Sequence, residues 1–390
     1  MRTLEDAVMA ARVVLLLALA HSALAIRINF TSCQTPEWLC VNNAPNEIVY
    51  TCAVRNNDVI IHLKDYYTDH ITSVTVQNCR DLRVVLDCPM LRTASQLRRF
   101  RVKDCDKLEF VSLSTSSVLQ TPPEVTIENV REILSLPSRI FKSPSTNTEL
   151  KCSGSALLKK IRISNSKINV INTKAIHNVT GIKNIEFENV TIADIRNQAI
   201  EAIMGADSVF AMTNNKVEKI DFKSIVVQSA TATISENTFN DITGNSINIT
   251  ADNLRVVGNK FREIRANGLI LKSVYVDISH NDIKTLKTHA LNSIRCLRRR
   301  MNMKQFSFST NRIEHVEPFS LNFDYASCKS AGASVTFSNN KMDCKCPNIA
   351  FLNTASTNSE LYNLILDATN NNTCLSAPCV LPIDILKILL

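Results

Sequence analysis

The chain has 390 residues, a formal net charge of +8 and only 7 glycines. This length exceeds what one compact core of ordinary size accommodates, whereas a solenoid of stacked repeats has no such limit. Charges of both signs are spread along the chain, so the positive excess fits a solvated surface, with weak affinity for acidic polymers such as heparan sulfate as the alternative. The few glycines leave few places where backbone could cradle a phosphate or an oxyanion.

The N-terminus carries the pattern of a secretory signal. Arg2 and Arg12 precede the apolar run VVLLLALAHSALA, which ends at Ala25. This run is too short and wrongly flanked for a membrane span, so we predict a signal peptide over residues 1–25 rather than a buried N-terminal helix. No later stretch approaches the roughly 20 apolar residues that a transmembrane helix needs. These features predict a secreted, extracellular protein without a transmembrane segment.

Thirteen cysteines in a secreted chain predict disulfide bonds, because the secretory route is oxidising. The count is odd, so at least one thiol stays unpaired or forms an intermolecular bridge. N-x-S/T sequons are candidate glycosylation sites in such a chain, and they begin at Asn29, Asn178, Asn189, Asn248 and Asn371.

Residues 26–69 contain Cys33, Cys40 and Cys52 and end in the alternating segment VIIHL, which predicts a strand over Val59–Leu63. A solenoid must cover the open end of its core, and this segment precedes the first repeat. We therefore assign residues 26–69 as a cysteine-containing N-terminal cap.

Residues 70–342 are built from repeats, which are clearest between Phe210 and Leu291. The phrases MTNNKVEKI, ISENTFNDI, VVGNKFREI and ISHNDIKTL recur there, and their asparagines lie 22 residues apart, at Asn215, Asn237, Asn259 and Asn281. A fixed period of this size indicates stacked coils. We expect each Asn to point inward and to bond backbone groups that the turn leaves unpaired, so that its loss costs roughly 1 to 3 kcal/mol.

Further along each repeat, a small residue precedes an apolar one. The small residue lets the returning segment pack closely before the apolar residue fills the coil. These pairs are Ser224-Ile225, Ser246-Ile247, Gly268-Leu269 and Ala290-Leu291.

The segment VYVDISHNDIKTLKTHAL, Val274–Leu291, resembles the repeat LxxLxLxxNxLxxLxxxAFxxL of extracellular leucine-rich repeat proteins. The resemblance implies a horseshoe with short parallel strands on its concave face. Extending the same frame in both directions predicts about eleven strands. The apolar residues three before the Asn place mark them: Val76, Val102, Ile127, Ile163, Phe187, Met212, Ile234, Val256, Ile278, Phe308 and Phe337.

The Asn place has other occupants in the earlier repeats. Cys79 and Cys105 hold it in the first two, where a buried thiol can act as a small plug or form a bridge. Ser166 and Val190 hold it in the fourth and fifth repeats. Because valine cannot make the hydrogen bonds of the turn, we expect an irregular ladder there.

The last two full coils are longer, and each of their insertions contains one cysteine. Cys296 and Cys328 fall at similar points of adjacent coils, which predicts a bridge between them.

Residues 343–390 are assigned as a cysteine-rich C-terminal cap and tail. They resemble the cap of the same family, in which a C-x-C after the last strand is joined to two later cysteines. That resemblance implies the pairs Cys344–Cys374 and Cys346–Cys379. A zinc site is the alternative, but it favours paired short spacings such as C-x-x-C. The apolar end VLPIDILKILL is expected to cover the last coil, with a lipid-anchor signal as the alternative.

No HExxH, GxSxG or glycine-rich phosphate loop occurs in the sequence. We therefore expect no enzyme activity, no cofactor and no metal. The alternative fold is a right-handed parallel β-helix, which also has coils of this length with inward asparagines and often cleaves polysaccharides. The scarcity of glycine, the longer later coils and the C-x-C motif weigh against it.

Alternate strand residues point to opposite faces, so four adjacent predicted strands present rows of opposed charge. Such rows can steer and orient a protein ligand, which makes this face the predicted partner site; an ordinary solvated surface is the alternative. The residues are Arg99, Arg101, Lys103, Glu124, Glu128, Lys160, Arg162, Glu186 and Glu188. Later rows are neutral and small.

A basic segment, RCLRRRMNMK, follows the ninth predicted strand and contains Arg295, Arg298, Arg299 and Arg300. It can dock on a glycosaminoglycan, be cut by a basic-specific protease, or be only solvated. Nucleic acid is not expected, because secretion removes the partner and no aromatic-basic surface is apparent.

Together these features predict a secreted, non-enzymatic module that binds an extracellular protein through a solenoid surface. The alternatives are a structural matrix component linked through the odd cysteine, and a carbohydrate-active β-helix enzyme. The fold argument is stronger than the functional one.

Overall fold

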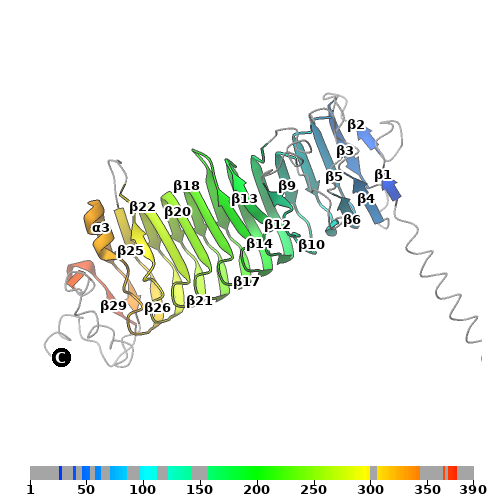
Figure 1. Ribbon diagram of the computed structural model, residues 1–390. Helices are drawn as coiled ribbons and strands as arrows, with labels where there is room; N and C mark the ends of the chain where they lie inside the picture. Colours follow the sequence, from blue (N-terminus) through cyan, green and yellow to red (C-terminus); the bar gives the residue numbers. More distant parts are fainter. Residues whose placement is uncertain are drawn as a thin grey trace, which may run out of the picture.

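The computed structural model describes residues 26–28, 38–40, 46–52, 58–62, 71–85, 97–111, 122–142, 157–298, 305–342, 363–364 and 368–375. These residues form an elongated parallel β-solenoid, with β1 near one end and β29 near the other (Figure 1). Among these residues, helix is confined to short segments such as α3, Tyr325–Ala331. The predicted signal peptide lies outside the described residues, as does most of the predicted C-terminal cap.

The first row of parallel strands, here the front row, is the one that the repeat frame predicts. All eleven marker residues are Cα partners of one another in unbroken register, from Val76 to Phe337. A twelfth strand precedes them, because Tyr50 pairs with Val76. The front row comprises β3 (Glu47–Thr51), β5 (Ser73–Gln77), β7 (Arg99–Lys103), β9 (Glu124–Glu128), β16 (Val209–Thr213), β25 (Gln305–Ser309), β27 (Ser334–Ser338) and parts of β12 (Lys160–Ile171), β14 (Asn184–Ile195), β18 (Ile225–Ser235), β20 (Ile247–Val257) and β22 (Leu269–Ser279).

Two further rows complete each coil. The second row comprises β1 (Ile26–Ile28), β4 (Asp58–His62), β6 (Asp81–Val85), β8 (Lys107–Val111), β10 (Glu132–Ile133), the later parts of β12 and β14, β17 (Lys216–Ile220), β19 (Thr238–Ile242), β21 (Lys260–Ile264), β23 (Asp282–Leu286), β26 (Arg312–Val316), β28 (Lys341–Met342) and β29 (Thr373–Cys374). The third row comprises β11 (Phe141–Lys142), β13 (Ile176–Thr180), β15 (Ile200–Ile203), the first parts of β18, β20 and β22, and β24 (Ile294–Cys296). β2 (Trp38–Cys40) runs antiparallel to β3.

One continuous apolar core runs the length of the solenoid. Strand residues alternate between this core and solvent, as the burial pattern of β16 illustrates with Phe210 and Met212 fully buried. Aromatic rings stack between neighbouring coils, with centroids 5.2 Å apart for Phe239 and Phe261. Because each such side chain stabilises by about 2 kcal/mol on burial, the core is the main source of stability.

The corners of the coils use left-handed backbone at residues other than glycine. At the corner after each of the eleven predicted front strands, the residue before the Asn place has a positive φ, for example 55° at Asn129 and 52° at Asn189. Asparagine tolerates this region because its short amide bonds locally. This explains how the solenoid turns so often with so few glycines.

The predicted small residues lie at the second corner, between the second and third rows. Ser224, Ser246 and Ala290 are fully buried. At Gly268 an added Cβ would lie 3.0 Å from the Arg265 carbonyl oxygen, so the approach of the backbone there leaves little room for a side chain.

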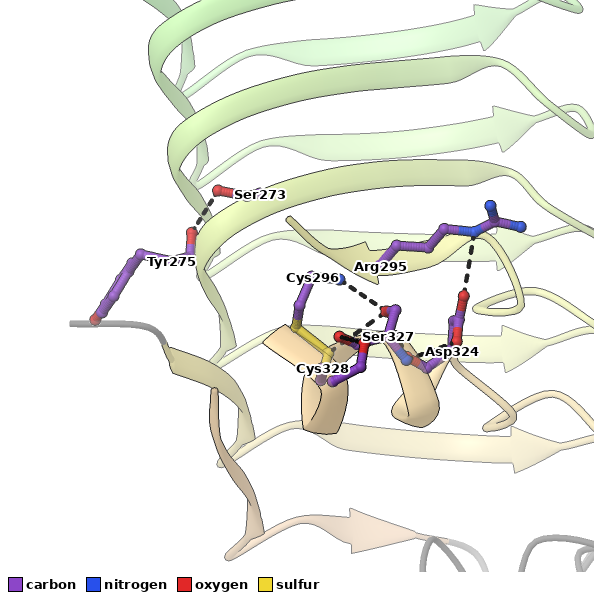
Figure 2. Close-up of a disulfide and its surroundings, with 8 residues drawn as sticks. Ser273, Tyr275, Arg295, Cys296, Asp324, Ser327 and Cys328 are labelled. Atoms are coloured by element: carbon purple, nitrogen blue, oxygen red, sulfur yellow. Dashed lines mark hydrogen bonds and ion pairs between the residues drawn. A yellow bond between two sulfur atoms is a disulfide. The ribbon is translucent and has the colours of Figure 1, made fainter. Parts of the chain in front are cut away.

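Within the part of the chain that the structure describes, two disulfides join neighbouring coils. Cys296 and Cys328, the pair predicted from the two insertions, are bonded, with Cα atoms 4.6 Å apart. Figure 2 shows this bridge between β24 and α3, where the Cys296 amide also donates to Ser327 Oγ at 3.0 Å. The second bridge links Cys52 to Cys79. It ties the predicted N-terminal cap to the first repeat.

Candidate functional site

The predicted partner-binding residues lie on four adjacent strands of the front row. We call this surface the charged face; it consists of Arg99, Arg101 and Lys103 on β7, Glu124 and Glu128 on β9, Lys160 and Arg162 on β12, and Glu186 and Glu188 on β14. Register places opposite charges side by side. Arg99 and Lys160 both neighbour Glu124, and Lys103 neighbours Glu128.

Several of these charges pair within the face. Arg101 contacts Glu128 at 2.8 Å, although half of the arginine side chain stays exposed. Arg162 contacts Glu188 at 2.8 Å and Glu186 at 3.8 Å. Exposed pairs of this kind contribute only about 0 to 1 kcal/mol each, so they orient the side chains more than they stabilise the fold.

Two residues at the centre of the face have no ion pair among the described residues. Glu124 and Lys160 are neighbours in register and half-exposed. Arg99, by contrast, pairs with Glu47 on β3. Sequence reasoning missed Glu47 because it placed this strand in the cap, although the alternation of EIVYT is a strand signal.

The front row beyond β14 has a different surface. Most of its outward residues are neutral and many are small, and hydroxyls approach one another, for example Ser307 Oγ and Ser309 Oγ at 3.1 Å. Arg255 and Asp277 form a pair at 3.6 Å within this surface. The strongly charged surface of the front row is therefore concentrated in the N-terminal half.

Beneath the neutral surface, the inward asparagines form one continuous chain of hydrogen bonds. Each amide oxygen accepts the backbone N–H of the residue in the Asn place one coil earlier, and each amide nitrogen donates to the marker carbonyl of that coil. For Asn237 these bonds are 2.8 Å, from Asn215 N and to the Met212 oxygen. We call this chain the inner ladder: Asn215, Asn237, Asn259, Asn281, Asn311, Asn340 and Asn372.

In the earlier coils, other residues bond the backbone groups of this turn. Val190 is buried and only donates its N–H, to Asn215 Oδ1 at 2.8 Å, so the inner ladder stops there, as expected. Ser166 Oγ accepts from Val130 N at 3.0 Å and donates to the Ser164 carbonyl. A hydroxyl thus replaces the amide with fewer bonds.

Cysteine takes both of the predicted roles at this position. Cys79 forms a bridge, whereas Cys105 is free and buried, and its Sγ lies 3.3 Å from the Lys103 carbonyl. Burial raises the pKa of the Cys105 thiol to about 11, although a hydrogen bond from the Cys79 backbone lowers it. A thiol with such a pKa is protonated and unreactive at neutral pH.

A second amide chain runs along the exposed corner of the N-terminal half. Its members all have positive φ and each amide nitrogen donates to the side-chain oxygen of the preceding coil, at 2.7 to 3.4 Å. We call this chain the outer ladder: Asp104, Asn129, Asn165, Asn189 and Asn214. The repeat frame does not predict it, because these residues stand one place before the aligned position.

The predicted glycosylation sites occupy different surroundings. Asn178, Asn189 and Asn371 are exposed with positive φ, whereas Asn248 is half-exposed on β20. The Asn189 amide already donates to Asn165 Oδ1 at 2.8 Å. Asn29 lies outside the described residues.

The basic segment is described only in part. Arg295 on β24 pairs with Asp324 at 3.4 Å (Figure 2), and Arg298 is exposed. Arg299 and Arg300 lie outside the described residues, as do Cys344, Cys346 and Cys379. Cys374 belongs to β29, but its side chain is not described, so the two predicted pairs of the C-terminal cap remain predictions.

A shallow depression lies on the second row of the N-terminal coils. It is lined by Arg80, Asp81, Asp106, Lys107, Arg131, Glu132 and Lys167. Bases and acids alternate across it in register, since Lys107 neighbours both Asp81 and Glu132. The lining therefore largely neutralises itself.

The second row also carries a charged edge at its later coils. Lys287 contacts Glu317 at 2.7 Å, and Thr288 donates to the same carboxylate. Burial acts to raise the pKa of Glu317, but the hydrogen bonds from Lys287 and Thr288 outweigh it and leave this pKa lowered. These bonds join neighbouring coils. Among the described residues, neither this edge nor any other place holds a group of three or more potential metal ligands.

No known protein family and no curated protein matches this chain. Among the described residues, no helix is long and apolar enough to cross a membrane. The class of protein that the structure defines is a parallel β-solenoid whose coils are joined by stacked side-chain amides and disulfides.

Proposed function

We propose that this protein is a secreted, non-enzymatic recognition module that binds an extracellular protein through the charged face. The observation that carries the proposal is the concentration of opposed charge on four rigid, adjacent strands. Strand-borne side chains are held more firmly than loop residues, and ordered rows of charge govern orientation and encounter rate.

We infer further that the solenoid is of the leucine-rich repeat type. The support is the residue-by-residue likeness of Val274–Leu291 to that repeat, together with coil lengths that vary from 22 to 36 residues. Secretion is supported by the N-terminal apolar run and by two disulfides, which are typical of oxidising compartments. A carbohydrate-active β-helix remains the alternative, and it is distinguished by turnover of a polysaccharide.

The structure adds one argument against a matrix component linked through the odd cysteine. Of the five cysteines whose side chains the structure describes, four are bonded and Cys105 is free and buried, which leaves eight of the thirteen, an even number. Cys105 therefore accounts for the odd count without an intermolecular bridge. A disulfide-linked series of bands on a non-reducing gel would contradict this.

The test is a pull-down of the tagged, secreted protein against a library of extracellular domains. Arg101→Glu should abolish capture of a specific partner, because it inverts the charge at the middle of β7. The matched control is Arg101→Glu with Glu128→Arg, which restores the internal ion pair but leaves the surface pattern inverted. If the control regains binding, the ion pair itself and not the outward charge matters, and the proposal is wrong in that form.

A further inference from the structure

The charge rows of the charged face alternate across the sheet. Their order is positive on β7, negative on β9, positive on β12 and negative on β14. A pattern with this alternation and an even number of rows is complementary to its own reversed copy. Isologous dimers use such self-complementary surfaces, in which a patch meets the same patch of a second subunit.

We propose that the charged face binds the charged face of a second copy of this chain, about a two-fold axis parallel to the strands between β9 and β12. This inference rests on the proposed function, because it names the partner of the same surface. The axis sets β7 opposite β14 of the second copy, and β9 opposite β12. Every facing pair of rows then has opposite sign.

The agreement extends to individual positions along the strands. Residues at equivalent positions are identified by the register of the front row, where Arg101, Thr126, Arg162 and Glu186 form one line. Arg101 therefore faces Glu186 of the second copy, and Lys103 faces Glu188. Near the axis, Glu124 faces Lys160 of the second copy. The two-fold axis generates each of these contacts a second time, with the two copies exchanged.

Other arrangements of the same two faces bring like charges together. An axis through β9 sets β7 against β12, both positive, and an axis through β12 sets β9 against β14, both negative. An axis perpendicular to the strands sets each row against itself. Since facing like charges are strongly disfavoured, the pattern selects one arrangement and rejects its neighbours.

The central residues are those best placed to make new contacts. Glu124 and Lys160 have no ion pair among the described residues, whereas Glu186 and Glu188, which face Arg101 and Lys103 of the second copy, already contact Arg162. Four strands of five residues span roughly 19 by 16 Å, an area of about 300 Å². This is well below the area of about 800 Å² that each partner of a standard interface buries. The association is accordingly weak and falls with salt.

The experiment is analytical ultracentrifugation of the purified full-length secreted protein at low ionic strength, up to a few hundred micromolar. It is run before and after enzymatic removal of N-linked glycans, since Asn189 lies at the border of the face. The wild type should approach twice the monomer mass. Glu124→Lys and Lys160→Glu should each weaken this association at least about tenfold, because each sets like charges across the axis twice.

An equimolar mixture of the two single variants separates this geometry from any internal effect. The first variant carries lysine at both central positions, 124 and 160, and the second carries glutamate at both. Every central pair across the axis then has opposite sign in the mixture, so the mixture should associate although neither variant does alone. Raised salt should abolish the association of the wild type and of the mixture. Circular dichroism of each variant checks that the solenoid is intact.

Two results overturn the proposal: a wild type that stays monomeric in both glycosylation states, or a mixture that associates no better than its components. Neither result removes the proposed function. A monomeric protein that still captures a different extracellular domain, and loses it on Arg101→Glu, would retain the recognition role with another partner. Self-association without any such capture would support the dimer alone.

Discussion

The coils before and after Asn214 satisfy their turns in different ways. In the N-terminal half, side-chain amides stack on the exposed corner, and the Asn place is filled by cysteine, serine or valine. From Asn215 onward, the amides stack inside the coil and the corner residues vary, with Glu236, Gly258 and His280 in succession. The two ladders meet at the adjacent residues Asn214 and Asn215.

The difference teaches what a stacked amide contributes in each environment. A buried amide replaces water for backbone groups that have no other partner, so each inner asparagine is worth several hydrogen bonds at once. An exposed amide competes with water and contributes little. Both halves have a disulfide and ion pairs between coils: Cys52–Cys79 and Arg101–Glu128 in the first, Cys296–Cys328 and Lys287–Glu317 in the second. The inner ladder is therefore what sets the second half apart.

The largest effect is expected from Asn259→Ala in the middle of the inner ladder. It removes the acceptor of Asn237 N and Nδ2 and the donor to the Ile234 carbonyl. Unfolding free energy should fall by about 4 kcal/mol, because several buried groups lose partners at about 1 to 3 kcal/mol each before relaxation. Urea denaturation measures this loss.

The matched control for that variant is Asn165→Gly in the outer ladder. Glycine keeps the positive φ of 48° at no steric cost while removing the exposed amide. We expect a loss below about 1 kcal/mol. Equal losses for the two variants would show that burial does not distinguish the ladders.

The next effect concerns the two bridges. The unfolding free energy should fall by about 3 kcal/mol when either pair is replaced by Ala, Cys296 with Cys328 or Cys52 with Cys79. The two losses should be similar because the sequence separations are 32 and 27. Guanidinium denaturation of the two double variants compares them. A much larger loss at Cys52 and Cys79 would indicate that the N-terminal half depends more on its bridge.

Cys105 gives a pH dependence that only the N-terminal half should show. Its folded pKa, raised to about 11, exceeds the ordinary value of 9.0, so the unfolded thiol ionises first. Stability therefore falls as pH rises from about 9 towards 11, by about 1.4 kcal/mol per unit. Cys105→Ser should lack this loss in denaturation at pH 8 and pH 10. An identical loss in both proteins would assign it to other groups.

The smallest effect tests whether the inner ladder can be extended. Val190→Asn should change the unfolding free energy by no more than about 1 kcal/mol, because lost apolar burial is offset by new bonds to Asn215 and to the preceding marker carbonyl. Thermal denaturation measures it. The reverse change, Asn259→Val, should lower the unfolding free energy far more. Similar losses for the two variants would mean that the coils differ in more than this residue.

Much of the fold could be predicted because repetition reveals it. The period of 22 residues, the apolar markers and the inward asparagines place every front strand from Val76 to Phe337 correctly. The predicted bond between Cys296 and Cys328 followed from their equivalent places in adjacent coils. The outward rows of the charged face followed from strand alternation alone, and their role in binding is still a prediction.

Contacts between coils depended on the tertiary structure. The strand at Glu47–Thr51 has no clear Asn place, so only its pairing with β5 joins it to the front row and brings Glu47 to Arg99. The outer ladder is likewise invisible in one repeat, because it needs amides of several coils to stack. Cys79 has a cysteine in the coil on each side, Cys52 and Cys105, and only the structure shows that it bonds to Cys52 and leaves Cys105 free.

The sequence by itself determined the coil, the core positions and the polar groups at each turn, since these are local and are repeated many times. Only the tertiary structure decided which side chains meet across coils, how far charges cancel within the face, and that exposed amides stack into the outer ladder. The physical reason is that stacking distance and register, and not the order of residues within one repeat, set the contacts between repeats.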